Sequence, residues 1–487
     1  MRNWKDVNGK LIIKVLGLLL IIEGFFMWLC LPFSHYFQSG DFFDILLSGI
    51  ITTLTGLIIW FFTRKNKNKN LGKREGYIIV TFAWIIISIF GALPFVLNGA
   101  IPNYTNAFFE TMSGFTTTGA SILTDIESVP KGLLFWRSLT HWIGGMGIIV
   151  LSLAILPILG IGGMQLFAAE VPGPTPDKLH PRVTGTAKRL WGIYILLTLV
   201  ETVFLLFGGM DFFDSLCHSF GTMATGGFST KNNSIMGFSP YIQYVIAIFM
   251  ILAGTNFTLH YFALMGKFDK LKKNEELRFY LLLIIIATAV ITISMIILRN
   301  TAFEKAFRDS LFQVVSIVTT TGFVTSDYLL WPNYVWFLIF LLMFTGGCAG
   351  STGGGIKAMR QLLLFKNSAV QLKRLIHPRA FIPVKFNGKS IPQEIILNIL
   401  AFFLFYMIIF AFGTLVMSFL GLDLNSAMGS VIASLGNIGP AIGDVGPTGN
   451  YAAIPSVGKW FLSFLMLLGR LEIFTVLIIL TPAFWKK

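Results

Sequence analysis

Long apolar segments recur along the whole of this chain, and they constrain its fold more than any other feature. Residues 11–31 and 461–480, for example, leave no polar face that water could wet. A helix needs about 20 mostly apolar residues to cross the hydrocarbon core of a bilayer. Charged residues make up 12% of the 487 residues, whereas an average soluble chain has about 25%. An ordinary soluble enzyme and a disordered chain are therefore excluded, and the sequence predicts an all-α polytopic membrane protein.

Ten segments are long and apolar enough to be membrane spans. The first begins among basic residues, as a signal peptide would, but it is too long and lacks a small-residue cleavage site, so we expect a retained helix. The predicted spans are 11–31, 45–62, 77–97, 135–159, 190–207, 241–264, 280–298, 334–365, 395–420 and 460–484.

The loops after the even-numbered spans are basic, and by the positive-inside rule these loops and both termini lie in the cytoplasm. The formal net charge of +14 also requires that nucleic-acid binding be considered. Because the basic residues occupy short loops between spans, with no basic stripe interleaved with aromatic residues, we expect no nucleic acid as a partner. The cysteines form no CxxC pair and indicate neither a disulfide framework nor a metal site.

Four segments between the later pairs of spans can be aligned with one another. In each, a residue typical of helix caps stands thirteen positions before a glycine. We therefore expect four short helices of about three turns, each entering the membrane and returning on the same side. The segments are NAFFETMSGFTTTGA with Asn106 and Gly119, DSLCHSFGTMATGGF with Asp214 and Gly227, DSLFQVVSIVTTTGF with Asp309 and Gly322, and SAMGSVIASLGNIGP with Ser426 and Gly439.

Four such returns imply one shared cavity, because non-helical backbone at membrane depth is tolerated only where it is buried in protein or lines a watery space. The repeating unit is helix, re-entrant loop, helix, so that one chain supplies a pseudo-tetrameric pore. The expected division is an N-terminal helix pair with a basic linker in 1–75, then pore repeats in 76–188, 189–277, 278–390 and 391–487.

The re-entrant loops have the chemistry of a cation site without side-chain charge. Backbone carbonyls can replace the water shell of an ion, and glycine permits the dihedral angles that point consecutive carbonyls inward. A short helix entering from outside also directs the negative end of its dipole at the cavity. The candidate filter residues are Thr116, Thr117, Thr118, Gly119, Ala224, Thr225, Gly226, Gly227, Thr319, Thr320, Thr321, Gly322, Asn437, Ile438 and Gly439.

Further motifs accompany TTTGA, ATGGF, TTTGF and GNIGP: WRSLTHWIGGMG from Trp136, GGCAGSTGGGIK from Gly346 and GRLEIF from Gly469. With them the chain resembles, over most of its length, the Trk/Ktr/HKT superfamily of potassium transporters, and bacterial TrkH-type membrane subunits in particular. The resemblance implies a potassium-channel-like pore folded from one chain, with potassium as substrate and no cofactor. The helix pair before the first repeat favours the TrkH type over the shorter KtrB type. GNIGP departs from the pattern because it lacks the threonines of the other loops.

The resemblance also implies the setting in which the chain works. It implies a homodimer in the bacterial cytoplasmic (inner) membrane, paired with a ring of cytosolic TrkA-like RCK regulatory subunits that bind nucleotides. Basic loops around Arg64, Lys270 and Arg374 are candidate docking surfaces, although anionic membrane lipid explains them equally well.

Six glycines fall within the predicted span 334–365, where each would cost a continuous helix roughly 1 kcal/mol, so we expect the helix to break. A phosphate-binding loop would need Gly-Lys followed by Ser or Thr, and this segment lacks it. Two interpretations remain: glycines for close helix packing, or an intramembrane loop that gates the pore, as in the resembling family. The candidate gate residues are Gly346, Gly347, Gly350, Ser351, Thr352, Gly353, Gly354, Gly355, Lys357 and Arg470.

Arg470 stands halfway along the last predicted span, where a charge costs at least about 3 kcal/mol. It either pairs with Glu472 or Glu110 in a structural salt bridge, or projects into the pore below the filter and repels cations.

Other polar residues within the spans carry weaker expectations. His141 is expected to be a satisfied core histidine, and Glu23, Glu110 and Glu201 are intramembrane acids that could carry protons.

The predicted function is potassium uptake by a protein that is not an enzyme. A membrane-embedded enzyme acting on lipid would need a clustered acid, base or metal set, and six scattered histidines without HExxH or an Asp-rich motif argue against it. A structural or receptor subunit would not need four matched pore loops. Channel-like passage and proton- or sodium-coupled symport, including a sodium-coupled KtrB-like transporter, both stay open.

Overall fold

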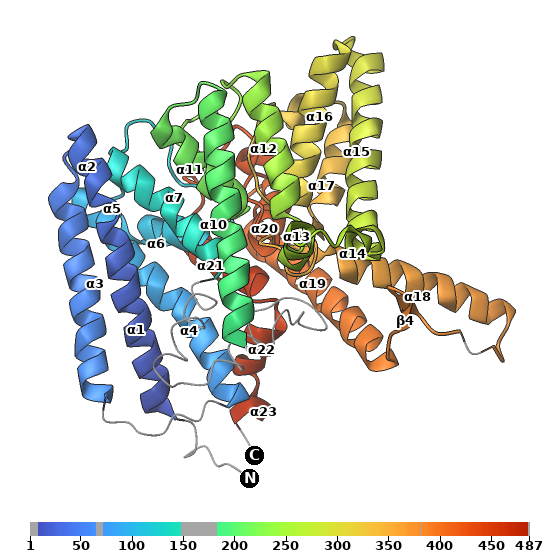
Figure 1. The fold of residues 1–487 in the computed structure, drawn as a ribbon, viewed down its shortest axis with the longest axis horizontal. Coiled ribbons are helices and arrows are strands. Elements are labelled where there is room, and N and C mark those ends of the chain that lie inside the picture. Colours follow the sequence, from blue (N-terminus) through green and yellow to red (C-terminus); the bar gives the residue numbers. More distant parts are fainter. Residues whose placement is uncertain (1–7, 65–71, 148–182, 381, 486–487) are drawn as a thin grey trace.

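A computed structural model describes residues 8–64, 72–147, 183–380 and 382–485. Figure 1 shows a body of long helices around short central ones, with α18 projecting from one side. Within these ranges, six helices, or eight if each of two bent pairs counts as one span, are long and apolar enough to cross a membrane. The end of the fourth predicted span, 148–159, lies outside the described residues.

The first two predicted spans form a tightly packed pair at one edge of the molecule (Figure 1). Helix α1 (Gly9–Trp28) is followed by the short α2 (Leu31–Phe37) and by α3 (Phe42–Thr63). A Cβ on Gly56 would lie 2.6 Å from the carbonyl oxygen of Gly17, so the two backbones meet where side chains are absent. The pair packs through α1 against the first repeat.

Each of the next four units contains an outer helix, a short re-entrant helix and an inner helix. The first has α4 (Lys73–Gly91), α5 (Leu93–Asn98), α6 (Tyr104–Phe115) and α7 (Lys131–Gly145). The second has α10 (Val183–Phe207), α11 (Phe212–Met223), α12 (Pro240–Ala253), α13 (Phe257–Leu264) and α14 (Phe268–Lys272). The third has α15 (Glu275–Arg299), α16 (Phe303–Val318), η2 (Tyr328–Leu330), α17 (Asn333–Leu342) and α18 (Ala358–Ile376). The fourth has α19 (Gln393–Phe419), α20 (Leu424–Gly436), η3 (Gly443–Val445), α21 (Ser456–Arg470), α22 (Phe474–Leu480) and α23 (Pro482–Trp485).

In the part of the chain that the structure describes, two pairs of very short strands interrupt this helical fold. Strand β1 (Thr345–Gly346) pairs in parallel with β2 (Ile356–Lys357) and closes the neck of the glycine-rich segment, which we call the intramembrane loop (residues 346–357). Strands β3 (Lys385–Phe386) and β4 (Lys389–Ser390) form an antiparallel hairpin between α18 and α19, which we call the hairpin.

The inner helices of the last three repeats are broken. The predicted break within 334–365 is confirmed, because α17 ends at Leu342 and α18 begins at Ala358. The expectation of continuous spans at 241–264 and 460–484 is wrong: α12 and α13 meet at 102°, and α21 and α22 at 118°. In the first case the side chain of Asn256 accepts the amide of Thr258 and starts a new helix.

The re-entrant helices exist as predicted, but their predicted caps are wrong. Three of these helices begin three residues earlier than the alignment implied, because another Asn or Asp there accepts the free amides of the first turn. The observed caps are Asn103, Asp211 and Asp423, while α16 begins after Ala302. The residues expected as caps, Asn106, Asp214, Asp309 and Ser426, lie inside the helices.

Candidate functional site

The four loops that follow the re-entrant helices share one unusual backbone conformation. In each, a residue with positive φ is followed two positions later by a glycine with positive φ. The first members are Thr117, Thr225, Thr320 and Asn437, with φ of 53°, 55°, 59° and 53°. The glycines are Gly119, Gly227, Gly322 and Gly439, with φ of 80°, 78°, 84° and 94°. Left-handed backbone is uncommon outside glycine, so its fourfold recurrence in register marks one repeated structure.

These four loops close into a ring. A Cβ placed on Gly119 would lie 2.1 Å from the carbonyl oxygen of Gly226, in the second loop. The same construction on Gly227 meets Thr321 of the third loop at 2.1 Å, and on Gly322 it meets Ile438 of the fourth at 2.0 Å. On Gly439 it meets Thr118 of the first loop at 2.7 Å, which completes the circle. Each glycine thus allows the carbonyl of the next repeat to approach, and the four loops surround one axis.

In the first and third loops, the threonines on either side of the left-handed residue make hydrogen bonds within their own repeat. The hydroxyl of Thr116 donates to the carbonyl of Met112 at 2.7 Å and lies 2.8 Å from the hydroxyl of Thr118. Thr319 repeats this arrangement with Val315 and Thr321, at 2.7 Å each. The hydroxyls of Thr116, Thr118, Thr319 and Thr321 are thereby engaged within their own repeats.

The fourth loop keeps the shared conformation although it lacks the threonines. Asn437 tolerates the left-handed region better than most residues. Its amide nitrogen donates to the hydroxyl of Thr118 at 2.9 Å and to the carbonyl of Met466 at 3.0 Å. This side chain therefore ties the fourth loop to the first loop and to α21.

A buried ion pair supports the outer side of the first loop. Glu110 of α6 accepts hydrogen bonds from Arg137 at 2.7 Å, from the hydroxyl of Ser121 at 2.9 Å and from the amide of Ile122 at 2.8 Å. Arg137 also donates to the carbonyl of Ser229 in the second repeat, at 3.0 Å. The pair thus holds the chain after the first filter loop and connects two repeats, and Glu110 is not the partner of Arg470.

The outer loops carry further contacts between repeats. The amide group of Asn232, in the second repeat, donates to Asp125 in the first at 3.0 Å. This hydrogen bond lowers the pKa of the Asp125 carboxyl from its ordinary value. A second exposed acid, Asp423, also has a lowered pKa, because it accepts hydrogen bonds from Ser426.

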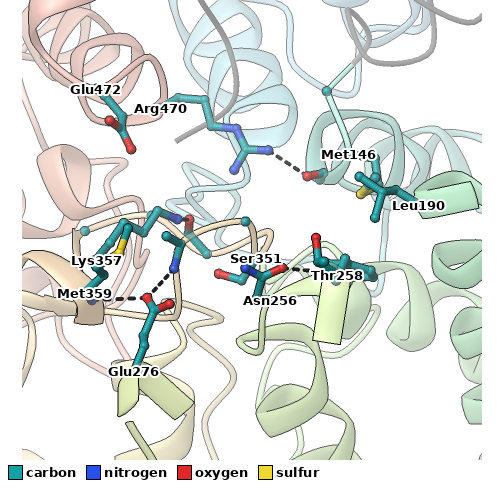
Figure 2. A pocket seen from close by; sticks show the side chains of 18 of the residues that line it. Met146, Leu190, Asn256, Thr258, Glu276, Ser351, Lys357, Met359, Arg470 and Glu472 are labelled. Atoms are coloured by element: carbon teal, nitrogen blue, oxygen red, sulfur yellow. Dashed lines mark hydrogen bonds between the residues drawn. The ribbon is translucent and has the colours of Figure 1, made fainter. Parts of the chain in front are cut away.

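Arg470 is the last residue of α21, and its side chain points toward the segment that holds Met146 (Figure 2). Its guanidinium donates to the hydroxyl of Thr117 at 3.2 Å and to the carbonyl of Thr352 at 2.7 Å. It also donates to the carbonyls of Gly144 and Gly145 at 2.5 and 2.9 Å. One side chain of the fourth repeat therefore joins the first filter loop, the end of α7 and the intramembrane loop.

The salt bridge considered for Arg470 is replaced by other pairs. Among the described residues, Glu472 forms its ion pair with Arg360 of α18, and Glu110 forms its ion pair with Arg137. Lys357, the other basic candidate, donates to the carbonyl of Gly353 within the intramembrane loop.

The intramembrane loop is fastened directly to the ring and to the break in the second inner helix. The amide of Gly354 donates to the hydroxyl of Thr320 at 2.7 Å, and the hydroxyl of Thr352 donates to the carbonyl of Met223 at 3.0 Å. The amide of Cys348 donates to the carbonyl of Gly254 at 2.8 Å, and that of Phe257 donates to the carbonyl of Gly350 at 3.0 Å. The predicted gate residues therefore lie together under the predicted filter residues.

A cavity of about 200 Å³ lies beside the intramembrane loop. Its lining includes several of the residues predicted to form the gate, namely Arg470, Lys357 and glycines of the loop (Figure 2). Glu276 and Asn256 also line it, and no sequence motif predicted a role for either. The sequence did contain one signal for Asn256. It comes two residues after Gly254, and a glycine followed by an Asn is typical of one helix ending and another beginning.

The other polar candidates are buried away from this cavity. His141 makes a 2.7 Å hydrogen bond to the carbonyl of Gly114 and stacks on Phe228. It is a core histidine as expected, but it is only partly satisfied, because its Nε2 has no hydrogen-bond partner among the described residues. Glu23 and Glu201 are 1% and 0% exposed, and their carboxyl oxygens have no hydrogen-bond partner in the described part of the chain.

Comparison with known proteins decides the family. The family model TrkH, described as a cation transport protein, matches residues 42–487. The chain belongs to the TrkH family. The Trk system potassium uptake protein TrkH of Escherichia coli (strain K12) is 41% identical over 488 residues, which cover 99% of this chain and 100% of the relative. The protein of the same name from Halomonas elongata is 39% identical over 482 residues, covering 98% and 99%.

A solved structure agrees with the TrkH family assignment. The crystal structure of the potassium transporter TrkH from Vibrio parahaemolyticus matches with a TM-score of 0.88 and 38% identity, covering 98% of this chain and 100% of that one. The predicted resemblance is therefore confirmed. The predicted fold class is also confirmed: an all-α membrane protein with four pore-loop repeats in one chain and an N-terminal helix pair.

Proposed function

We propose that this TrkH-family chain takes up potassium across a membrane through the ring of four filter loops. The observation that carries the proposal is the closed circle of left-handed glycines, each against a carbonyl of the next repeat. The names of the relatives support the choice of ion, since they are potassium uptake proteins. Transport rather than catalysis accounts for the matched pore loops, and no cofactor is needed.

Backbone carbonyls act as the ligands of potassium in this proposal. The ion loses its water shell and is bound instead by rings of carbonyl oxygens. Little reorganisation is needed, because the backbone already holds these oxygens in place. The C-terminal ends of α6, α11, α16 and α20 lead into the filter loops, so their dipoles also favour a cation there. The proposed filter is residues 116–119, 224–227, 319–322 and 437–439.

Arg470 and the intramembrane loop form the proposed gate. A fixed positive charge below the ring repels a cation that leaves it, and the loop fills the path between the ring and the cavity. Hydrogen bonds fasten both of them, with Thr352 bonded to Arg470 and Gly354 to Thr320. Such contacts can be exchanged for water, which suits a barrier that must move.

The proposal extends to the setting in which the chain works. We propose a homodimer in a bacterial cytoplasmic membrane, with cytosolic TrkA-like subunits that bind nucleotides, and with both termini in the cytoplasm. The Gly9 end of α1 and α23 lie at the same edge of the molecule, which supports a common side for the two ends (Figure 1). The division into a helix pair at 1–75 and repeats at 76–188, 189–277, 278–390 and 391–487 belongs to the same proposal.

Ion flux into liposomes containing the purified protein tests this function. We expect uptake of potassium in large excess over sodium, driven by the potassium gradient. Repeating the measurement with an imposed proton or sodium gradient separates coupled symport from channel-like passage. Equal sodium and potassium flux, or no ion flux in well-folded protein, would overturn the proposal.

A further inference from the structure

The first turn of α15 holds both ends of the intramembrane loop. Glu276 is 3% exposed, and one of its carboxylate oxygens accepts the amide of Ala349 at 2.6 Å and the amide of Met359 at 3.1 Å. Ala349 lies near the start of the loop, and Met359 lies in the first turn of α18, just after its end. Figure 2 shows Glu276 reaching from α15 toward this neck of the loop.

A carboxylate is well suited to this position. The first amides of a helix have no partner within the helix, and the positive end of the helix dipole lies there. Hydrogen bonds to a charged acceptor are shorter and stronger than those between neutral groups. Burial of Glu276 is tolerable because the charge is met by two amides that would otherwise lack an acceptor.

The neck lies within a few residues of the hydrogen bonds that hold the gate. Cys348, adjacent to Ala349, is bonded through its amide to Gly254 at the broken inner helix. Four residues beyond Cys348, the carbonyl of Thr352 accepts the guanidinium of Arg470. A neck that opens would therefore displace both the loop and one of the contacts that orient Arg470.

The same turn of α15 also binds the hairpin between α18 and α19. Glu275 accepts hydrogen bonds from the ammonium of Lys366 at 2.6 Å and from the amide of Asn387 at 2.9 Å. The amide of Glu275 donates in return to the side chain of Asn387 at 2.9 Å. Phe386 and Asn387 line the cavity below the loop. The adjacent residues Glu275 and Glu276 thus hold the hairpin, outside the pore, and the intramembrane loop, inside it.

We propose that Glu276 is a positioning residue that keeps the intramembrane loop across the pore, and that the first turn of α15 transmits movement of the hairpin to that loop. The effect on flux rests on the proposed function, in which the loop obstructs the pore. The position of the loop can be measured independently of flux.

Cys348 supplies that independent measurement. It is buried in the loop, and Cys30 and Cys217 are buried elsewhere, so they serve as internal controls. The reconstituted full-length protein is treated with a maleimide, and labelling of each cysteine is followed by peptide mass spectrometry alongside potassium flux. The variants are Glu276→Ala, which removes the acceptor, Glu276→Gln, which keeps a carbonyl acceptor, and Glu275→Ala. Glu394→Ala is the matched control, since Glu394 is an exposed acid in the first turn of α19.

Glu276→Ala should raise the rate of Cys348 labelling at least about tenfold, corresponding to about 1.4 kcal/mol. Cys30 and Cys217 should label at the parental rate, potassium flux should rise, and Glu276→Gln should lie closer to the parent. Unchanged Cys348 labelling, or equal acceleration at all three cysteines, would overturn the role of Glu276.

Two outcomes separate the parts of the proposal. Faster Cys348 labelling without faster flux would support the positioning role and would instead overturn the gating function proposed for the loop. Parental Cys348 labelling in Glu275→Ala would overturn transmission from the hairpin, whereas faster labelling there, with Glu394→Ala unchanged, supports it.

Discussion

Gly322→Ser should weaken potassium selectivity because it forces two filter loops apart. A Cβ at this position would lie 2.0 Å from the carbonyl oxygen of Ile438, whereas real Cβ contacts are essentially never under 3.0 Å. The two loops must therefore separate locally by about 1 Å. Binding sites need their ligands held within about 0.5 Å, so a displacement of this size disturbs a carbonyl ring.

Backbone strain adds to the steric effect and needs its own control. Gly322 has φ of 84°, and a residue with a side chain pays about 1–2 kcal/mol in the left-handed region. Gly209 has φ of 86° with nothing within 4 Å of its constructed Cβ. Gly209→Ser therefore carries the same strain without the clash.

The assay is uptake of potassium and sodium into liposomes that contain equal amounts of folded protein. We expect the potassium-to-sodium preference of Gly322→Ser to fall at least roughly tenfold, or about 1.4 kcal/mol, while Gly209→Ser keeps the parental preference. A folded Gly322→Ser protein with a preference within about twofold of the parent would refute the ring geometry. An equal loss of potassium-to-sodium preference in Gly209→Ser would show that backbone strain, and not displacement of the filter loops, causes the loss.

Three further outcomes are expected. Arg470→Ala should speed tracer uptake per molecule, because repulsion of an ion about 5 Å away is roughly 3 kcal/mol at an effective dielectric near 20, and Arg470→Lys should stay nearer the parent; a destabilised Ala protein with no gain in flux would contradict this. Deleting three residues within 350–355 should raise flux, and unaltered flux in folded protein would instead favour a packing role for the glycines. Glu110→Gln should lower the free energy of unfolding by about 3–5 kcal/mol, because it leaves the buried Arg137 without its charged partner. A Tm equal to that of the parent would contradict this expectation.

The repeated architecture could be predicted from the sequence because its signals are local. Apolar length predicts spans, and the registers of Gly119, Gly227, Gly322 and Gly439 predict four matched loops. The caps could not be assigned in the same way. Asp211 and Asp214 are both good caps, and only the observed helix start distinguishes them.

The contacts below the ring depend on tertiary structure, so the sequence could not predict them. Arg470 had two acids, Glu472 and Glu110, as candidate partners, but folding brings backbone carbonyls of the first and third repeats to it instead. Glu276 has no motif of its own, and its two partners are 73 and 83 residues away in the chain. The break after α21 likewise lacks a proline, and Glu472 and Ile473 there adopt positive φ of 57° and 40°.

Ion density in the ring tests the potassium pathway most directly. Crystals of the full-length protein grown in rubidium, a potassium substitute with strong anomalous scattering, should show anomalous peaks on the axis enclosed by the carbonyls of the four filter loops. The same peaks should weaken when sodium replaces rubidium. Ordered filter loops with no rubidium between them at saturating concentration, or rubidium bound elsewhere along the path, would contradict a filter built from these four repeats.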